Sequence, residues 1–267
     1  MAKFSPVKQT GFGPVAVVVF VLLYLPIVMV VLYAFNSGAS VAKFEGFSLQ
    51  WFAKAWANDH VKDATIRSVW LAAVAAVIST FVATLAALGT TRRAAFRGQT
   101  LIYATINQPL MVPEIVTAVA LLIVTASIKV ITGYQGMGFL VAAHSAFCIP
   151  FAYLPIRARL EGMNTTLETA AADLYARPFA IFRRITLPLL WPGIIAGMML
   201  AFVTSLDDVV ITQFIKSAGQ ETLPTYMLAQ LRRQITTEVN AISTVLLAAT
   251  VLLLVLFFVL TRQKSET

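Results

Sequence analysis

Long stretches without a charged residue are the feature that most constrains this sequence. Five such windows run over 9–42, 68–91, 130–156, 185–206 and 239–261, and a sixth, 98–127, is interrupted only by Glu114. Each is long enough for the ~20 residues that a helix needs to cross a bilayer. With 59% hydrophobic and 12% charged residues, the chain is predicted to be an all-α polytopic membrane protein. We expect one transmembrane domain over 1–267, with spans at about 13–35, 67–90, 101–127, 139–157, 188–215 and 239–261.

The distribution of Lys and Arg predicts the orientation. The two termini and the loops that share their side hold twelve of the 20 basic residues, and the opposite loops hold eight, together with five acids. Because positive loops remain in the cytoplasm, both termini are expected there. No cleavable signal peptide is expected, since the first window is too long. In the first outer loop, "SLQWFAKAW" is predicted to form a short interfacial helix.

Three acids are predicted within the spans, and no Lys or Arg accompanies them. They are Glu114 and the adjacent pair Asp207 and Asp208. A carboxylate in the hydrocarbon core costs ~2.5 to 3.5 kcal/mol, so such groups are expected to face the bundle interior, water or a cation. Neighbouring helical residues diverge by ~100°. At most one aspartate is therefore expected to point into a pathway, and the other to serve a helix contact or a partner subunit.

Two prolines give Glu114 a distinctive setting. Pro109 and Pro113 break the helical pattern of the third span, and Pro113 is expected to begin a new helical segment at its N1 position, with Glu114 at N2. The positive helix end would then favour an ionised carboxylate beside irregular backbone, as in transporter sites. A structural proline kink with a protonated, hydrogen-bonded Glu114 is the alternative.

The longest inner loop, 158–188, is predicted to contain a short helix. In "NTTLETAAADLYARP", Asn164, Thr165 or Thr166 provides an N-cap, and Leu167, Ala170, Ala171 and Leu174 form an i, i+3, i+4, i+7 stripe. We expect Pro178 to end this helix, "FAIFRRI" to add a second amphipathic turn, and Pro188 and Pro192 to bracket the start of the fifth span. A hairpin on the membrane surface and a peg for a partner protein are both compatible with this pattern.

This loop resembles the cytoplasmic EAA loop of ABC importer permeases, whose pattern is Glu-Ala-Ala, three residues, Gly, nine residues, then Ile-x-Leu-Pro. Ala170 and Ala171 match, and Ile185, Leu187 and Pro188 close the pattern. Thr169 replaces the Glu, with Glu168 one residue away, and Tyr175 replaces the Gly. The resemblance implies a type I importer fold and a loop that inserts into a cytoplasmic ATPase. The residues it assigns to ATPase coupling are Glu168, Thr169, Ala170, Ala171, Asp173, Leu174, Tyr175, Arg177, Pro178, Ile185, Leu187 and Pro188.

Further stretches are similar to permeases of the polyamine (putrescine and spermidine) type, among them "PLMVPEIVTAVALL" and "LAFVTSLDDVVITQF". The resemblance implies a bacterial inner-membrane subunit paired with a second, homologous permease, two ATPase chains and a periplasmic binding protein. ATP and Mg²⁺ would bind the ATPase, and this chain would bind no cofactor. Permeases for iron and other small solutes share a similar acid-bearing fifth span, so a permease for iron or for an amino-acid-like compound is an alternative.

Polyamine ammonium groups stay charged at neutral pH, with a pKa of ~10. Carboxylates replace part of their hydration, so Glu114, Asp207 and Asp208 are the candidate pathway residues. Aromatic faces supply cation-π contact, and the candidates are Tyr103 and Phe151, followed by Phe147 and Tyr153, although ordinary packing also explains each of these rings.

Other chemistry has weaker support in the sequence. His144 and Cys148 share a helical face, but no third ligand is evident and no metal site is predicted. The stretch "GYQGMG" lacks the Lys-Ser/Thr of a P-loop. An intramembrane enzyme with magnesium on the Asp pair would need further acids, and a proton-coupled secondary transporter would leave the spacing of the EAA-like loop unexplained.

Overall fold

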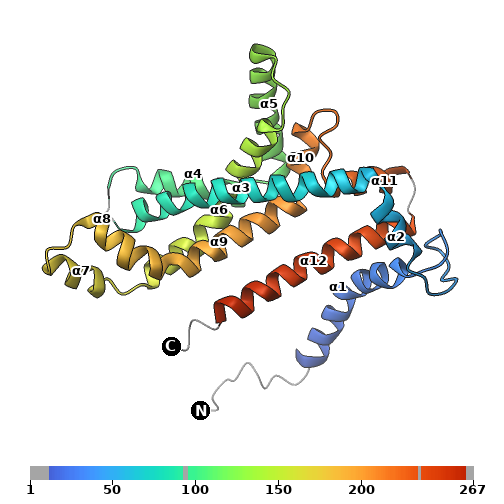
Figure 1. Ribbon diagram of the computed structural model, residues 1–267, viewed down its shortest axis with the longest axis horizontal. Helices are drawn as coiled ribbons and strands as arrows, with labels where there is room; N and C mark the ends of the chain where they lie inside the picture. Colours follow the sequence, from blue (N-terminus) through green and yellow to red (C-terminus); the bar gives the residue numbers. More distant parts are fainter. Residues whose placement is uncertain (1–11, 93–95, 234–235, 263–267) are drawn as a thin grey trace. The chain divides into compact units, whose positions relative to one another are not determined.

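The computed structural model describes residues 12–92, 96–233 and 236–262 (Figure 1). Four of the twelve basic residues counted on the side of the termini lie outside these ranges: Lys3, Lys8, Arg93 and Lys264. Within the described part, six helices are long and apolar enough to cross a membrane: Gly13–Ala34, Asp59–Thr91, Glu114–Thr132, Gly138–Gly162, Pro178–Asp207 and Thr237–Leu256. The prediction of an all-helical chain with six such helices is confirmed.

The chain divides into two compact units. The first comprises residues 1–59 and 227–251, and the second comprises 60–226 and 252–267. The first unit contains α1 (Phe12–Ala34), α2 (Gln50–Ala57) and most of both α11 (Leu223–Arg233) and α12 (Thr237–Arg262). The helix expected in "SLQWFAKAW" is α2, and its Lys54 forms an ion pair of 3.4 Å with Glu238 at the start of α12.

The core of the second unit is built on α3 (Asp59–Thr91), α6 (Gly138–Gly162) and α9 (Leu187–Asp207). Small residues allow α6 and α9 to approach closely. A Cβ atom on Gly197 would lie 2.6 Å from the Ala152 carbonyl oxygen, and one on Gly193 would lie 2.7 Å from Arg159 Cβ. Helix backbones meet this closely only where small residues lie at the contact.

The span expected at 101–127 is two helices, α4 (Gln99–Met111) and α5 (Glu114–Thr132). Val112 between them is extended, with φ −101° and ψ 138°, because it precedes a proline. Pro113 is the N-cap residue of α5, so Glu114 lies at N1, one position earlier than expected. The long membrane-crossing helix of this pair is α5, which continues to Thr132.

The expected role of Pro178 was wrong, because it begins a helix rather than ending one. Helix α7 (Thr166–Asp173) has already ended, and α8 (Pro178–Ile181) continues through a π-helical turn, η2 (Phe182–Thr186), into α9. Proline is favoured at the first helical position. The π-helical turn precedes Pro188, which has no N–H for the usual i→i−4 bond, and the Leu187 amide instead reaches the Phe182 carbonyl.

The fifth span is also interrupted at its other end. Helix α9 ends at Asp207, Asp208 is extended with φ −64° and ψ 129°, and a short helix, α10 (Val210–Ile215), follows. The sequence predicted one uninterrupted span over 188–215, and neither Pro nor Gly marks this position. The second unit therefore contains two spans with interrupted helices.

Candidate functional site

The two helix interruptions belong to elements that pack together. Helix α5 begins at Glu114, directly after the first interruption, and α10 begins at Val210, directly after the second. Helices α5 and α10 are in contact, and α10 also contacts α6. Irregular backbone inside a membrane protein is tolerated where it lies in protein or lines a water-filled cavity, and transporters bind ions and substrates at such places. The interruptions therefore define the candidate substrate site.

Glu114 and Asp208 lie near each other at this place. Glu114 is half-buried at the first turn of α5, and Asp208 is its neighbouring acid. Ionised carboxylates only accept hydrogen bonds. Two neighbouring carboxylates repel each other, so a proton on one of them or a cation between them stabilises the pair. Glu114 is thus one of two neighbouring acids rather than a lone anion.

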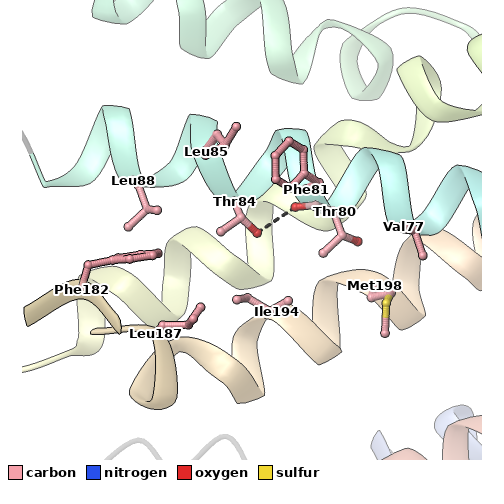
Figure 2. Close-up of a pocket in the computed structure, with 10 residues that line it drawn as sticks. All are labelled: Val77, Thr80, Phe81, Thr84, Leu85, Leu88, Phe182, Leu187, Ile194 and Met198. Atoms are coloured by element: carbon pink, nitrogen blue, oxygen red, sulfur yellow. Dashed lines mark hydrogen bonds between the residues drawn. The ribbon is translucent and has the colours of Figure 1, made fainter. Parts of the chain in front are cut away.

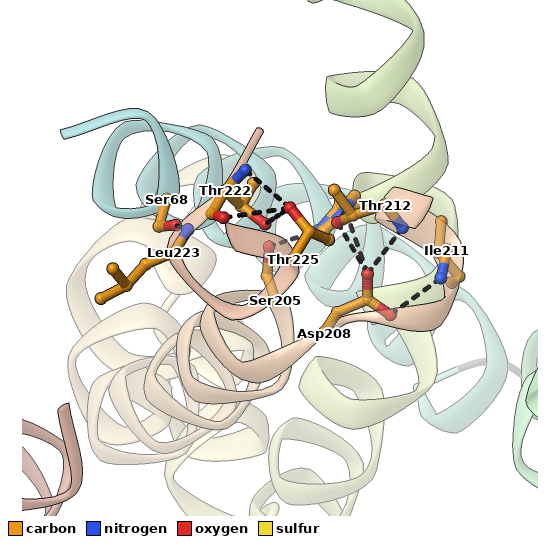
Figure 3. A network of polar contacts seen from close by, with 9 residues as sticks. Ser68, Ser205, Asp208, Ile211, Thr212, Thr222, Leu223 and Thr225 are labelled. Atoms are coloured by element: carbon orange, nitrogen blue, oxygen red, sulfur yellow. Dashed lines mark hydrogen bonds and ion pairs between the residues drawn. The ribbon is translucent and has the colours of Figure 1, made fainter. Parts of the chain in front are cut away.

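Asp208 serves as a cap for α10 (Figure 3). Its carboxylate accepts hydrogen bonds from the Ile211 amide at 3.2 Å, the Thr212 amide at 2.9 Å and the Thr212 hydroxyl at 2.9 Å. The residue is only 6% exposed. Helix N-termini leave amide groups without intrahelical partners, and an Asp carboxylate satisfies them. The interruption at Asp208 is therefore stabilised by the aspartate itself.

His144 of α6 joins this arrangement from the core. Nδ1 lies 2.8 Å from the Ser205 hydroxyl and Nε2 lies 2.9 Å from the Thr212 hydroxyl, with Asp208 Oδ2 at 3.4 Å. The one hydrogen of the Thr212 hydroxyl goes to Asp208, so Nε2–H donates to Thr212. Since both ring nitrogens are engaged, the contacts of His144 are those of a hydrogen-bonded core histidine. We call Glu114, His144, Ser205, Asp208 and Thr212 the break cluster.

Sequence reasoning did not place Ser205 and Thr212 in the site. Each lies within a few residues of the Asp pair, and a hydroxyl on either side of a buried acid was the available signal. Nearby, the Leu223 amide donates to the Ser68 hydroxyl at 2.7 Å, and Thr222 and Thr225 bond to each other (Figure 3). Buried polar groups thus continue from the break cluster toward the start of α11.

Asp207 and Asp208 differ in burial, although not through the predicted helical step, because Asp208 is extended after the end of α9. Asp207 is exposed at the last residue of α9, whereas Asp208 is buried. Within the described residues, the Asp207 side chain makes no hydrogen bond or ion pair. Asp207 is therefore the member of the pair that is available to a ligand, and Asp208 is committed to the fold.

The four candidate aromatic rings divide by their surroundings. Tyr153 is fully buried and its hydroxyl lies 2.9 Å from the Thr90 hydroxyl, and Phe147 is 7% exposed. Phe151 is half-buried against Phe147, with ring centroids 5.4 Å apart. Tyr103 is 41% exposed, but the Arg157 guanidinium lies 4.6 Å from its ring centroid. Tyr153 and Phe147 thus have the surroundings of core residues, and one Tyr103 face already holds a cation.

The EAA-like loop places α7 at the surface. The helix has no buried residue. Asn164 stabilises the first turn of α7, because its side-chain oxygen accepts hydrogen bonds from the Thr166 amide and hydroxyl at 2.9 and 2.6 Å. Only Glu168 and Ala171 are half-buried, and the exposed candidate coupling residues of this segment are Thr169, Ala170, Asp173, Leu174, Tyr175, Arg177 and Pro178.

Tyr175 has a positive φ of 56°, the only such non-glycine residue in the described part of the chain. This left-handed conformation favours glycine, which explains why the resembled pattern has glycine here. The Tyr175 amide bonds to the Ala172 carbonyl at 2.9 Å, and the residue is 96% exposed. The helix end thus keeps its turn, with an aromatic ring projecting outward.

Ile185, Leu187 and Pro188 lie where η2 joins α9. Ile185 and Leu187 are half-buried and Pro188 is exposed. Leu187 also lines an apolar groove of about 370 Å³ between α3 and α9, whose other walls include Phe81, Leu88 and Phe182 (Figure 2). The end of the EAA-like pattern is therefore part of the helix junction, whereas its beginning is a surface helix.

Comparison with known proteins agrees with this architecture. The chain is 35% identical over 233 residues to the putrescine transport system permease protein PotI of Escherichia coli K12, covering 86% of this chain and 83% of PotI. It is 34% identical over 249 residues to the spermidine/putrescine transport system permease protein PotC of Haemophilus influenzae, covering 93% and 95%.

A crystal structure of a bacterial ABC transporter that imports the acidic polysaccharide alginate has a similar fold, with a TM-score of 0.71 at 12% identity over 95% of this chain and 94% of that chain. The methionine ABC transporter MetNI gives a TM-score of 0.59 at 18% identity, over 77% and 98%. Residues 79–263 match the family described as the binding-protein-dependent transport system inner membrane component. This chain therefore belongs to the family of inner membrane components of binding-protein-dependent transport systems.

Proposed function

We propose that this chain is one of two permease subunits of an ATP-driven importer for polyamines of the putrescine and spermidine type. Relatives above 30% identity over most of the chain carry the names of such permeases. The packing of the two helix interruptions, which brings the acids Glu114 and Asp208 near each other, is the observation that carries the proposal for the site itself. An ammonium group supplies both the hydrogen-bond donors and the positive charge that two adjacent carboxylates require.

Within this proposal, Glu114 and Asp207 contact the substrate. Glu114 is half-buried next to Asp208, and Asp207 is exposed and without a hydrogen bond or ion pair in the described residues. Asp208 acts through Glu114, because its own oxygens already hold the start of α10. Phe151 offers a half-buried ring, and Tyr103 offers one after Arg157 moves from its face. The pathway thus combines carboxylates at the helix interruptions with two aromatic side chains.

The partners follow from family membership. A periplasmic binding protein delivers the amine, a second homologous permease completes the pathway, and two ATPase chains bind ATP and Mg²⁺. When ATP closes the ATPase dimer, α7 moves with it and the spans open outward to receive the substrate. The exposed side of α7, with Ala170 and Leu174, is the proposed contact with the ATPase. No bond of the substrate is made or broken on this chain.

Uptake competition tests the proposal. The permease pair, its ATPase and its binding protein would be placed in proteoliposomes with ATP inside and radiolabelled putrescine outside. We expect unlabelled putrescine or spermidine to abolish labelled uptake, and a neutral amino acid to leave it unchanged. Absence of ATP-dependent amine uptake by the intact assembly would contradict the proposal.

A second candidate substrate is a metal cation such as iron, because carboxylate oxygens at an interrupted helix also bind hard cations. The same assay separates the two candidates. Inhibition of labelled amine uptake by amines but not by ferric ion favours polyamines, and ATP-dependent uptake of radioactive iron in place of amines favours the metal.

A further inference from the structure

The carboxylate of Glu168 contacts two other side chains of this chain, those of Thr186 and Arg92. Its Oε1 accepts a hydrogen bond from the Thr186 hydroxyl at 2.9 Å and lies 3.4 Å from Arg92 Nη2. Arg92 directly follows the last residue of α3, and Thr186 is the last residue of η2, which leads into α9. One carboxylate thus links α7 to the ends of two long helices. We call Arg92, Glu168 and Thr186 the α7 anchor.

The surroundings make the α7 anchor more than a surface ion pair. The side chains of Arg92 and Glu168 are only 20% and 21% exposed, and Thr186 is 6% exposed. Solvent screens exposed pairs strongly and buried pairs much less. Arg92 Nε and Nη2 are buried and have no hydrogen-bond partner among the described residues, so Glu168 provides the charge compensation. Removing Glu168 would leave a mostly buried guanidinium uncompensated.

Helix α7 has little else that fixes its orientation. None of its residues is buried, so hydrophobic packing does not hold it. Ala171 is its only half-buried residue besides Glu168. At eight residues, the helix is too short to be stable by itself. The α7 anchor is therefore the polar contact that can carry a force from α7 into α3 and α9.

We propose that Glu168 is a positioning residue that couples the movement of α7 to the spans, through Arg92 to α3 and through Thr186 to α9. The inference rests on the proposed function, in which an ATPase moves α7. It assigns Glu168 a different task from the exposed residues of the same helix. Those residues contact the ATPase, and Glu168 transmits the movement within this chain.

The test is an exchange of charges. The variants are Glu168→Gln, Arg92→Gln, and the double exchange Arg92→Glu with Glu168→Arg, each in the complete assembly in proteoliposomes. The measured quantity is the number of amine molecules imported per ATP hydrolysed. We expect each single variant to lower this ratio at least fivefold while the ATPase still co-purifies, and the double exchange to restore it to within twofold of wild type.

Two further variants sharpen the result. Thr186→Val removes one hydroxyl at nearly constant volume, and we expect a two- to threefold loss of the ratio. Glu161→Gln is the matched control, because Glu161 forms an exposed ion pair with Arg157 at 2.7 Å near the same loop. Its import ratio should remain at the wild-type value. Size-exclusion profiles of every variant report whether the assembly is intact.

Three outcomes would overturn the inference. Unchanged coupling in both single variants would show that the α7 anchor transmits nothing. Loss of ATPase co-purification in Glu168→Gln would show that Glu168 contacts the ATPase. Failure of the double exchange to rescue coupling, in an intact assembly, would show that the pairing with Arg92 is not the cause. If the wild-type assembly bound an ATPase but imported no amine, the proposed substrate would fail, and the ATPase response to the binding protein would still test the α7 anchor.

Discussion

The break cluster and helix α7 differ in burial: most residues of the break cluster are buried within the chain, whereas α7 has no buried residue. In the break cluster His144, Ser205, Asp208 and Thr212 bond to one another, and His144 and Asp208 are 1% and 6% exposed. Helix α7 has no buried residue, and Leu174 and Tyr175, which follow it, are 82% and 96% exposed. A buried, satisfied network keeps its geometry without help. The exposed apolar residues at the end of α7 are where we propose that the ATPase docks.

The largest expected effect is from Asp208→Ala. This change leaves the Ile211 and Thr212 amides and the Thr212 hydroxyl without their acceptor in a buried place. Loss of a cap together with unsatisfied buried donors costs ~2 to 4 kcal/mol. We expect a clear fall in the unfolding temperature of the purified assembly and no measurable uptake.

Asp207→Asn is the matched control for stability, because its exposed side chain holds no element of the fold. Its unfolding temperature should equal that of wild type. Equal destabilisation by the two substitutions would show that the two aspartates do not differ in their structural roles.

Glu114→Gln separates charge from hydrogen bonding in the break cluster. The amide keeps the size of the side chain and can donate a hydrogen bond to a neighbouring carboxylate, so the fold should persist. If Glu114 meets an ammonium group, loss of the anion costs ~1.5 to 3 kcal/mol, and uptake at subsaturating amine should fall at least tenfold. Radiolabelled uptake measures this effect, and Glu114→Asp should retain more activity. Normal transport by Glu114→Gln in an intact assembly would make the interruption at Pro113 purely structural.

Ala170→Arg tests the exposed side of α7. Ala170 is exposed, so a long charged side chain fits the isolated chain but occupies the proposed ATPase contact. We expect at least fivefold less co-purified ATPase and an unchanged unfolding temperature of the permease pair. Ala171→Arg should differ, because Ala171 is half-buried and the substitution should lower that temperature. Undiminished co-purification with Ala170→Arg would refute this assignment of the surface.

The smallest effect is expected from Tyr175→Gly. Glycine relieves a left-handed conformation that costs about 1 kcal/mol, but it also gains entropy in the unfolded chain, so the two terms nearly cancel. Unfolding temperature and uptake should both stay close to wild type, with uptake within twofold. A complete loss of uptake would mean that the exposed Tyr175 ring contacts a partner.

Features that depend on neighbouring residues in the chain were mostly predicted correctly from the sequence. Charge-free windows predicted six membrane-crossing helices, and Pro113 predicted the interruption before Glu114, to within one residue. Asp207 and Asp208 diverge for another reason than the predicted ~100° step, because Asp208 is extended beyond the end of α9. Pro178 was misread because a proline both ends helices and begins them, and the local pattern does not decide between the two.

The sequence by itself determined the membrane class, the helical content, and the short helices in the first outer loop and in the EAA-like loop. Each of these depends on residues adjacent in the chain. Only the tertiary structure decided that Glu114 lies near Asp208 and that Glu168 faces Arg92 and Thr186. These pairs of residues are up to 94 positions apart, from Glu114 to Asp208. No periodicity or local propensity specifies which buried donor an acid will find, because that choice depends on how the helices pack.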